Sequence, residues 1–384
     1  MTYELKALLE IDYTEISELY QKVLNYKADT KDDAFALFTP EYTKYSIDLN
    51  FPTRELFFGI YAEGKLIGTI GATRVPILFQ GEELLGSAIT CYAIDPAVYP
   101  FPPDAKIQIF QDLIQKVKEH KVDFIWVTFV EENNADEMKL FKNELLFTRM
   151  NKNVESLVKL LGSEGVDILR EKKQMNVILA KMAKMMAGME TMDLPGGTIR
   201  KATPKDYPFT INLLNDYNKN LPITKIWTSK SFQHHIEVAS LLNEIDYLDL
   251  KTEYPNTPFG FHIEVWERDQ RIIAAILYRV VRIRFKNGDA PFGFWDYIAF
   301  DQELEFDAKK AFLLNMYNAL YRKAIIINVF LPDYDFKTFD KSGFMTERRK
   351  TPLLIFPLSE KGQKLVEIER LAQFYLTTDT DFAI

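Results

Sequence analysis

The fold is decided by three apolar runs, which read ELFFGIYA (Glu55–Ala62), KLIGTIGATRVPILF (Lys65–Phe79) and LLGSAITCYAID (Leu84–Asp95). They are rich in β-branched and aromatic residues, and the short polar turns EG and QGEE separate them, as is typical of antiparallel hairpins. An irregular loop, Pro96–Pro103, follows, and Asp104–His120 then has the apolar spacing of a helix. A meander followed by a helix predicts an α+β unit and argues against an alternating βαβ array.

The same order of segments returns about 200 residues later. Three apolar runs separated by polar turns are again followed by a loop, a helical segment from about 307 to 323 and one more apolar run. These four runs are FGFHIEVW (Phe259–Trp266), RIIAAILYRVVRIRF (Arg271–Phe285), PFGFWDYIAF (Pro291–Phe300) and AIIINVF (Ala324–Phe330). The last of them matches DFIWVTFV (Asp123–Val130) in the first half. The repetition predicts two copies of one domain rather than a short-period solenoid.

Several short motifs carry a resemblance to the GNAT acyltransferase superfamily. EGKLIGTIGA (Glu63–Ala72) resembles its second and third strands, AIDPAVY (Ala93–Tyr99) the end of its fourth strand, and FDKSGFM (Phe339–Met345) its last helix. The layout of two such copies is similar to that of N-myristoyltransferase, over roughly residues 1–357. The resemblance implies an α+β fold with two tandem GNAT-like mixed-sheet domains joined by a long helical connector.

We expect four segments along the chain. An N-terminal domain spans 1–155, a Met-rich helical connector 156–195, a C-terminal domain 196–357, and a helix with a tail 358–384. The connector prediction rests on Ser156–Met192, where apolar residues and methionines alternate with lysines at helical spacing. Leu194-Pro195-Gly196-Gly197 then breaks the helix.

Composition narrows the function classes. The chain has 384 residues, 47% of them apolar, which suits two domains with full cores. It carries 47 basic and 55 acidic residues, a net charge of −8, which argues against a nucleic-acid partner. The single cysteine excludes an intrachain disulfide, and no signal peptide, membrane span or metal-ligand spacing is recognisable. We therefore expect a cytoplasmic protein without a metal; the sequence leaves the oligomeric state open.

The resemblance also implies where a coenzyme would bind. GNAT enzymes join an amine to an acyl thioester, and their fourth and fifth strands splay so that backbone N–H groups polarise the thioester carbonyl. The pyrophosphate lies at the N-terminus of the following helix. Carried onto the first half, this predicts contacts to acetyl-CoA or another acyl-CoA from Tyr92, Ala93, Ile94, Asp95, Tyr99, Phe101, Asp104, Ala105 and Lys106. The acceptor, a small-molecule or peptide amine, would bind at the junction of the domains.

Two departures from the family pattern favour a second hypothesis. The loop Tyr99–Lys106 has no glycine and three prolines, which provide no N–H donors, and the loop 301–310 of the second half carries acids. The tyrosine that protonates the leaving thiolate in many family members is replaced by Phe141 and Phe339. The alternative is therefore a non-catalytic binding or regulatory protein on the same scaffold.

Two carboxylates are candidates for the general base. Asp296 lies within the apolar strand FWDY, where burial would raise its pKa, although a satisfied structural carboxylate is the commoner case for such a residue. N-myristoyltransferase uses its terminal carboxylate, which the resemblance transfers to Ile384. The tail Gln373–Ile384 is rich in large apolar residues, so we expect it to pack in the groove between the domains; a frayed acidic tail is the alternative. The aromatic segment 35–51 is expected to form core packing or a wall for an acyl chain.

Overall fold

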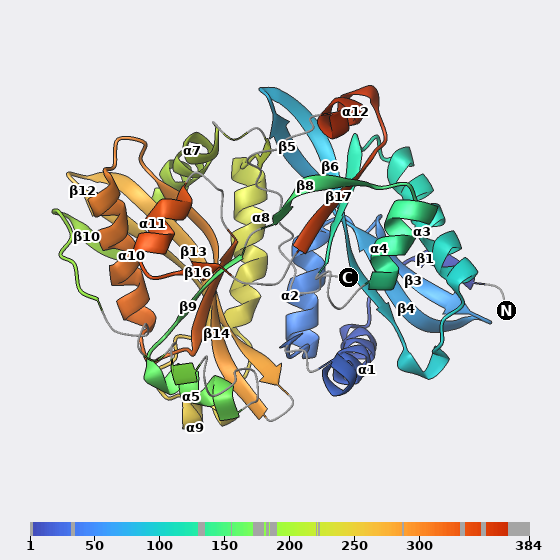
Figure 1. Ribbon diagram of the computed structural model, residues 1–384, viewed down its shortest axis with the longest axis horizontal. Helices are drawn as coiled ribbons and strands as arrows, with labels where there is room; N and C mark the ends of the chain where they lie inside the picture. Colours follow the sequence, from blue (N-terminus) through green and yellow to red (C-terminus); the bar gives the residue numbers. More distant parts are fainter. Residues whose placement is uncertain are drawn as a thin grey trace.

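The structure is a computed structural model of the whole chain. It describes residues 3–31, 35–129, 135–154, 156–171, 180–181, 184, 190–219, 221, 223–285, 288–330, 335–346 and 351–367. Two mixed β-sheets stand side by side, each with helices on its faces (Figure 1). The α+β class expected from the repeated meander is confirmed.

The first half of the chain supplies the following elements. They are β1 (Tyr3–Ala7), α1 (Tyr13–Lys31), β2 (Phe35–Ala36), α2 (Pro40–Asn50), β3 (Phe57–Ala62), β4 (Lys65–Ala72), β5 (Val75–Phe79), β6 (Glu82–Ile94), α3 (Pro103–Glu119), β7 (Phe124–Thr128), α4 (Ala135–Lys139), β8 (Thr148–Val154), β9 (Ser156–Leu160) and α5 (Ser163–Glu171). The expected single strand 65–79 is divided into β4 and β5, because the chain leaves the ladder at Thr73 and Arg74.

The second half repeats this order. Its elements are β10 (Thr198–Lys201), α7 (Tyr207–Asn218), β11 (Ile223–Lys225), α8 (Ser229–Ala239), α9 (Leu248–Glu253), β12 (Gly260–Arg268), β13 (Arg271–Phe285), β14 (Gly288–Phe300), α10 (Phe306–Leu320), β15 (Ile326–Phe330), α11 (Phe336–Lys341), β16 (Met345–Thr346), β17 (Thr351–Pro357) and α12 (Glu360–Glu367). The long strand expected at Arg271–Phe285 is confirmed with the same bounds.

The two halves exchange their last strands. The first sheet runs β1-β3-β4-β6-β7-β17-β8, and the second runs β10-β12-β13-β14-β15-β9-β16. Strand β17, from the end of the chain, therefore lies between two strands of the first half, and β9 lies between two strands of the second (Figure 1). The two sheets share one strand order, as the repeated module predicts, but each is completed by the other half.

A second, smaller exchange joins the halves near their beginnings. Strand β2 pairs with β13 of the second half, and β11 pairs with β5 of the first half. Both short strands precede a helix, α2 or α8, and these two helices lie against each other between the sheets (Figure 1). The halves are thus related by an approximate two-fold arrangement in which four strands cross over.

The connector differs from its sequence prediction at its start. Ser156–Leu160 is strand β9, not the beginning of a helix, and it pairs with β15 and β16. The physical reason is the run Ser-Leu-Val-Lys-Leu, which satisfies its backbone hydrogen bonds in a sheet and buries Leu157 and Leu160. Helix α5 begins only at Ser163, and most of the Met-rich segment after it lies outside the described residues.

One apolar core spans both halves. It includes the side chains of α1 and α2, the inner face of the second sheet, and the aromatic residues of segment 35–51. Of these aromatic residues Phe38, Tyr42, Tyr45 and Phe51 are each at most 3% exposed. Their close mutual ring contacts support the packing interpretation of this segment. His235 is buried against the ring of Trp227, and the ring of His234 hydrogen-bonds the carbonyl of Asp48, so both histidines serve packing and the junction.

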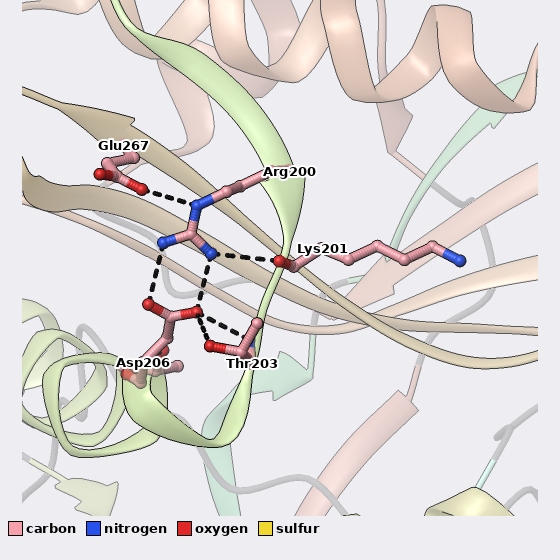
Figure 2. Close-up of polar contacts among 6 residues, drawn as sticks. Arg200, Lys201, Thr203, Asp206 and Glu267 are labelled. Atoms are coloured by element: carbon pink, nitrogen blue, oxygen red, sulfur yellow. Dashed lines mark hydrogen bonds and ion pairs between the residues drawn. The ribbon is translucent and has the colours of Figure 1, made fainter.

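An ion-pair cluster fixes the beginning of the second half. Arg200 on β10 donates to Glu267 at 2.6 Å and, with two nitrogens, to Asp206 at 2.7 and 2.9 Å (Figure 2). Asp206 also accepts the backbone N–H of Thr203, and the Arg200 guanidinium holds the pKa of this carboxyl well below its usual range. Bidentate geometry makes this a strong orienting contact that ties β10 to β12 and to the start of α7.

Candidate functional site

Strand β6 carries an open edge at the predicted coenzyme position. Its parallel pairing with β7 covers only Gly86–Ala88 against Phe124–Trp126, and no described residue of β7 pairs with β6 beyond that point. The strand also bulges there, because Cys91 has a left-handed φ of 56° and both Cys91 and Tyr92 face one residue of β4. A bulge re-aims a strand, so β6 and β7 splay apart, as the family resemblance implies.

The predicted β6 residues lie on this splayed part. Ala93 and Ile94 are buried and pair with Thr69 and Gly68 of β4, so only their backbone edge faces the splay. The ring of Tyr92 packs on Phe110 at 5.0 Å, and burial raises the pKa of its hydroxyl. A tyrosine hydroxyl with a raised pKa gives up its proton less readily, but it can still donate a hydrogen bond.

The loop after β6 is held by its own side chains. Asp95 accepts the N–H of Ala97 at 2.9 Å and lies 3.9 Å from Lys22. Tyr99 stacks on Tyr26 with ring centroids 5.5 Å apart, and Phe101 packs edge-on against a ring of β1. These contacts order the loop without the glycines that the family usually has there.

Helix α3 begins directly after this loop. Pro102 is its N-cap and makes no side-chain cap, Pro103 is its first residue, and Asp104 places a negative charge in the first turn. Ala105 and Lys106 complete that turn. The macrodipole of the helix favours an anion here, whereas Asp104 opposes one.

Lys106, the expected partner of the pyrophosphate, already has a counter-ion. Its Nζ donates to Glu137 of α4 at 2.8 Å and lies 5.6 Å from the centre of the Tyr92 ring. The second half repeats the pair, since Lys309, at the same fourth position of α10, lies 3.6 Å from Asp335. Burial lowers the pKa of Lys309 and raises the pKa of Asp335 to about 6.

The second half has a bulge of its own at Asp296. Strand β14 pairs with β15 from Phe292 to Trp295 and bulges relative to β13 at Asp296, so this carboxylate lies where the first half has its open edge. The sequence left Asp296 open between a general base and a structural carboxylate, and the structure gives it a buried partner. Arg279 of β13, only 6% exposed, holds both carboxylate oxygens at 3.1 Å.

Arg279 also reaches into the other half. Its Nη1 donates to the hydroxyl of Tyr42 on α2 at 3.2 Å, and its guanidinium lies 4.5 Å from the centre of the Phe294 ring. The chain of contacts from Tyr42 through Arg279 to Asp296 therefore crosses the junction where the acceptor is expected. Sequence reasoning missed Arg279 and Glu137, and it named Tyr42 only as part of the aromatic segment 35–51. The available signal was a single arginine within the apolar run ILYRVV, which required a partner.

The remaining predicted features divide into two groups. Phe141 and Phe339, at the positions of the family tyrosine, are both 0% exposed and pack against other phenylalanines. Ile384 and the whole tail Gln373–Ile384 lie outside the described residues.

Within the part of the chain that is described, no cluster of acidic, histidine or cysteine side chains could hold a metal ion, and no helix is long and apolar enough to cross a membrane.

Comparison with solved structures places the fold. The chain superposes on N-myristoyltransferase of Saccharomyces cerevisiae with bound myristoyl-CoA with a TM-score of 0.67 and 14% identity, over 92% of this chain and 82% of that one. A second structure of that enzyme, with myristoyl-CoA and inhibitors, gives 0.67 and 15% over 92% and 80%. A conserved Enterococcus faecalis protein described as a probable N-acyltransferase gives 0.53 and 10%, over 94% and 74%. No family model and no curated protein matches the sequence. The chain therefore has the tandem fold of N-myristoyltransferase.

Proposed function

We propose that this chain, which has the N-myristoyltransferase fold, is an N-acyltransferase that binds an acyl-CoA in its first half and an amine acceptor at the junction of the halves. The observation that carries the proposal is the splay of β6 from β7 at the Cys91 bulge. An unpaired strand edge suits the pantetheine arm, which pairs with it as an added strand, and places backbone N–H groups at the thioester carbonyl.

The charge pattern supports the first half as the coenzyme half. At the N-terminus of α3 a partly exposed Lys106 stands close to the open edge, whereas the corresponding edge in β14 is filled by Asp296 and its arginine. The loop before α10 adds Glu303 and Glu305, and the first turn of α10 adds Asp307; these acids repel a diphosphate. In this proposal Tyr92–Asp95 contact the pantetheine arm and Tyr99–Lys106 contact the phosphates.

The junction of the halves is the proposed place for the acceptor and for the base that takes its proton. The acceptor amine approaches the thioester from the α2 side, beside the Tyr42–Arg279–Asp296 chain. Because Asp296 is ion-paired, its proposed role is to hold Arg279 and orient the acceptor. The proton of the attacking amine then passes to another carboxylate, and the chain terminus at Ile384 is the candidate that the family resemblance provides.

Binding and turnover of a coenzyme series test the proposal. Purified protein is titrated calorimetrically with coenzyme A and with acyl-CoAs from acetyl to myristoyl, and thiol release is followed with a panel of amines and peptides. We expect saturable binding of an acyl-CoA and acceptor-dependent thiol release. Lys106→Glu tests the phosphate contact directly.

Two observations favour the alternative, a non-catalytic binding or regulatory protein. Lys106 is neutralised by Glu137, and both positions of the proton-donating tyrosine hold buried phenylalanine. Under this alternative acyl-CoA binds without thiol release, or does not bind at all. The titration and the thiol assay together separate the two functions, because only an enzyme gives acceptor-dependent turnover.

A further inference from the structure

A cavity lies in the first half, away from the open edge of β6. It is open on one side, has a volume of about 240 Å³ and is bounded by the loop after α2, the break between β4 and β5, and the start of β6. Six of its ten lining residues are apolar, and the only two charged ones are Arg54 and Arg74.

The position of the cavity separates it from the coenzyme edge. Leu85, in its wall, donates its backbone N–H to Asp123, which follows the C-terminal end of α3. The predicted coenzyme loop precedes the N-terminal end of that helix. Since α3 has 17 residues, and a helix rises 1.5 Å per residue, roughly 25 Å lie between the two places.

The two arginines present their charges differently. Arg54 is oriented by ion pairing with Asp48 and by the hydroxyl of Tyr13, and its side chain is 22% exposed. Arg74 is exposed, and no carboxylate among the described residues pairs with it. Glu55, the acid that follows Arg54 in the sequence, lies 3.8 Å from His120.

Arg54 is also strained. Its φ of 59° is left-handed, a conformation that glycine or asparagine adopts more easily than arginine. Strain retained at a cavity wall is a mark of sites where the side chain matters. A glycine here would suit the backbone better but would remove the guanidinium.

From this arrangement we infer that the cavity binds a small organic carboxylate with an apolar body, the carboxylate on Arg74 and Arg54 and the body on Phe51, Leu56 and Leu85. A guanidinium matches the two oxygens of a carboxylate. A volume of about 240 Å³ holds roughly eight groups of the size of a water molecule or methylene, at about 30 Å³ each. Octanoate fits both the volume and the charge, and the site goes beyond the proposed acyl transfer.

Octanoate is the probe, with octanol and octyl phosphate as its neutral and phosphate counterparts. Saturation-transfer NMR and calorimetry on the full chain measure binding. We expect saturable binding of octanoate, weaker binding of octyl phosphate, and little binding of octanol. Equal binding of octanol and octanoate would show that the arginines play no part, and tighter binding of octyl phosphate would reassign the site to phosphates; either result overturns the inference.

Variants locate the bound probe. Arg74→Gln and Arg54→Gly should each weaken octanoate binding about tenfold, the effect of losing a hydrogen bond to a charged group. Arg74→Gln removes an exposed side chain, so its melting temperature should be unchanged, and Arg54→Gly relieves backbone strain. Arg271→Gln, an exposed arginine on another strand, is the matched control, and Lys106→Glu tests whether the probe instead occupies the coenzyme edge. Loss of binding in Lys106→Glu but not in Arg74→Gln would refute this site, as would unchanged binding in both arginine variants or no saturable binding into the millimolar range.

Discussion

Leu354 of β17 pairs with Val127 of β7, so a residue near the end of the chain completes the sheet of the first half. Both side chains are fully buried. The same relation holds in the other direction, where Leu157 of β9 pairs with Val329 of β15. Neither half therefore contains all the strands of its own sheet, and this exchange sets the first prediction.

Removal of β17 should destabilise the first half, although its sequence remains complete. A chain that ends at Thr346 exposes the edges of β7 and β8 and leaves gaps on both faces of the sheet, where Leu354 fills one core cluster and Leu353 and Ile355 fill another. Three fully buried aliphatic side chains contribute about 5 kcal/mol or more before entropy. We expect loss of the cooperative thermal transition, measured by circular dichroism, and rapid hydrogen exchange in β7. A chain that ends at Glu367 keeps β17 and α12 and is the control; equal melting temperatures for the two would contradict the strand exchange.

The last residues can then be tested separately for catalysis. If a tail carboxylate is the base, the chain that ends at Glu367 keeps its melting temperature and its acyl-CoA affinity but loses thiol release by a factor of about 100 or more. A shorter deletion of Ile384 alone moves the terminal carboxylate by one residue and should lower the rate with little effect on binding. A full rate in both deletions would remove the tail from the mechanism.

The pair Lys106–Glu137 should control coenzyme affinity. Glu137→Gln removes the counter-ion and leaves Lys106 for the phosphates, so binding should tighten by about fivefold, an energy near 1 kcal/mol. Lys106→Glu should weaken it by more than that, and the double variant should resemble Lys106→Glu. Calorimetric titration of the acyl-CoA measures all three. Lys309→Glu is the matched control in the second half. An equal loss of acyl-CoA affinity in this variant would contradict the placement of the coenzyme in the first half.

The buried pair Arg279–Asp296 should respond asymmetrically to substitution. Asp296→Ala leaves the guanidinium of Arg279 buried without its carboxylate, a change that costs about 3–5 kcal/mol in free energy of unfolding. Replacing both residues, with Arg279→Met and Asp296→Leu, should recover most of that loss. Tyr42→Phe removes the hydroxyl that accepts a hydrogen bond from Arg279, and it should cost about 1 kcal/mol in free energy of unfolding. Denaturant unfolding measures each variant, and an unaffected Asp296→Ala protein would show that the pair is not buried as described.

Lys159 should make stability depend on pH in the alkaline range. Its Nζ lies 3.9 Å from the centre of the Tyr317 ring and donates to the carbonyl of Ser342, and burial lowers its pKa from 10.5 to about 8. The folded state therefore releases this proton more easily than the unfolded state. Stability contributed by this group rises as the pH increases from about 8 towards 10.5 and is flat below that range.

Lys159→Met tests this dependence. The side chain of Lys159 lies against the rings of Tyr317 and Phe344. An apolar side chain is therefore compatible with the site, and we expect the variant to gain about 1–2 kcal/mol at pH 7 and to lose the alkaline rise. The exposed Lys65→Met is the control. The same change in stability between pH 8 and 10 in the wild type and in Lys159→Met would contradict the role of Lys159.

The sequence by itself determined the repeated module and its local elements. The run Arg271–Phe285 is strand β13 with unchanged bounds, since an apolar, β-branched stretch between two polar turns has few alternatives. It also located the end of β6 at Tyr92–Asp95, together with the loop and the helix that follow it. These features depend on neighbours in the chain, and local composition is enough to predict them.

Only the tertiary structure shows to which sheet each strand belongs and which charged side chains are paired. Ser156–Leu160 reads as part of an amphipathic helix, yet its backbone hydrogen bonds are satisfied by β15, some 170 residues later in the chain. Asp296 and Lys106 read as available groups until Arg279 and Glu137 are seen beside them. Pairing between distant segments depends on how both sheets pack around a shared core. The periodicity and composition of a single segment therefore cannot predict its partner strand.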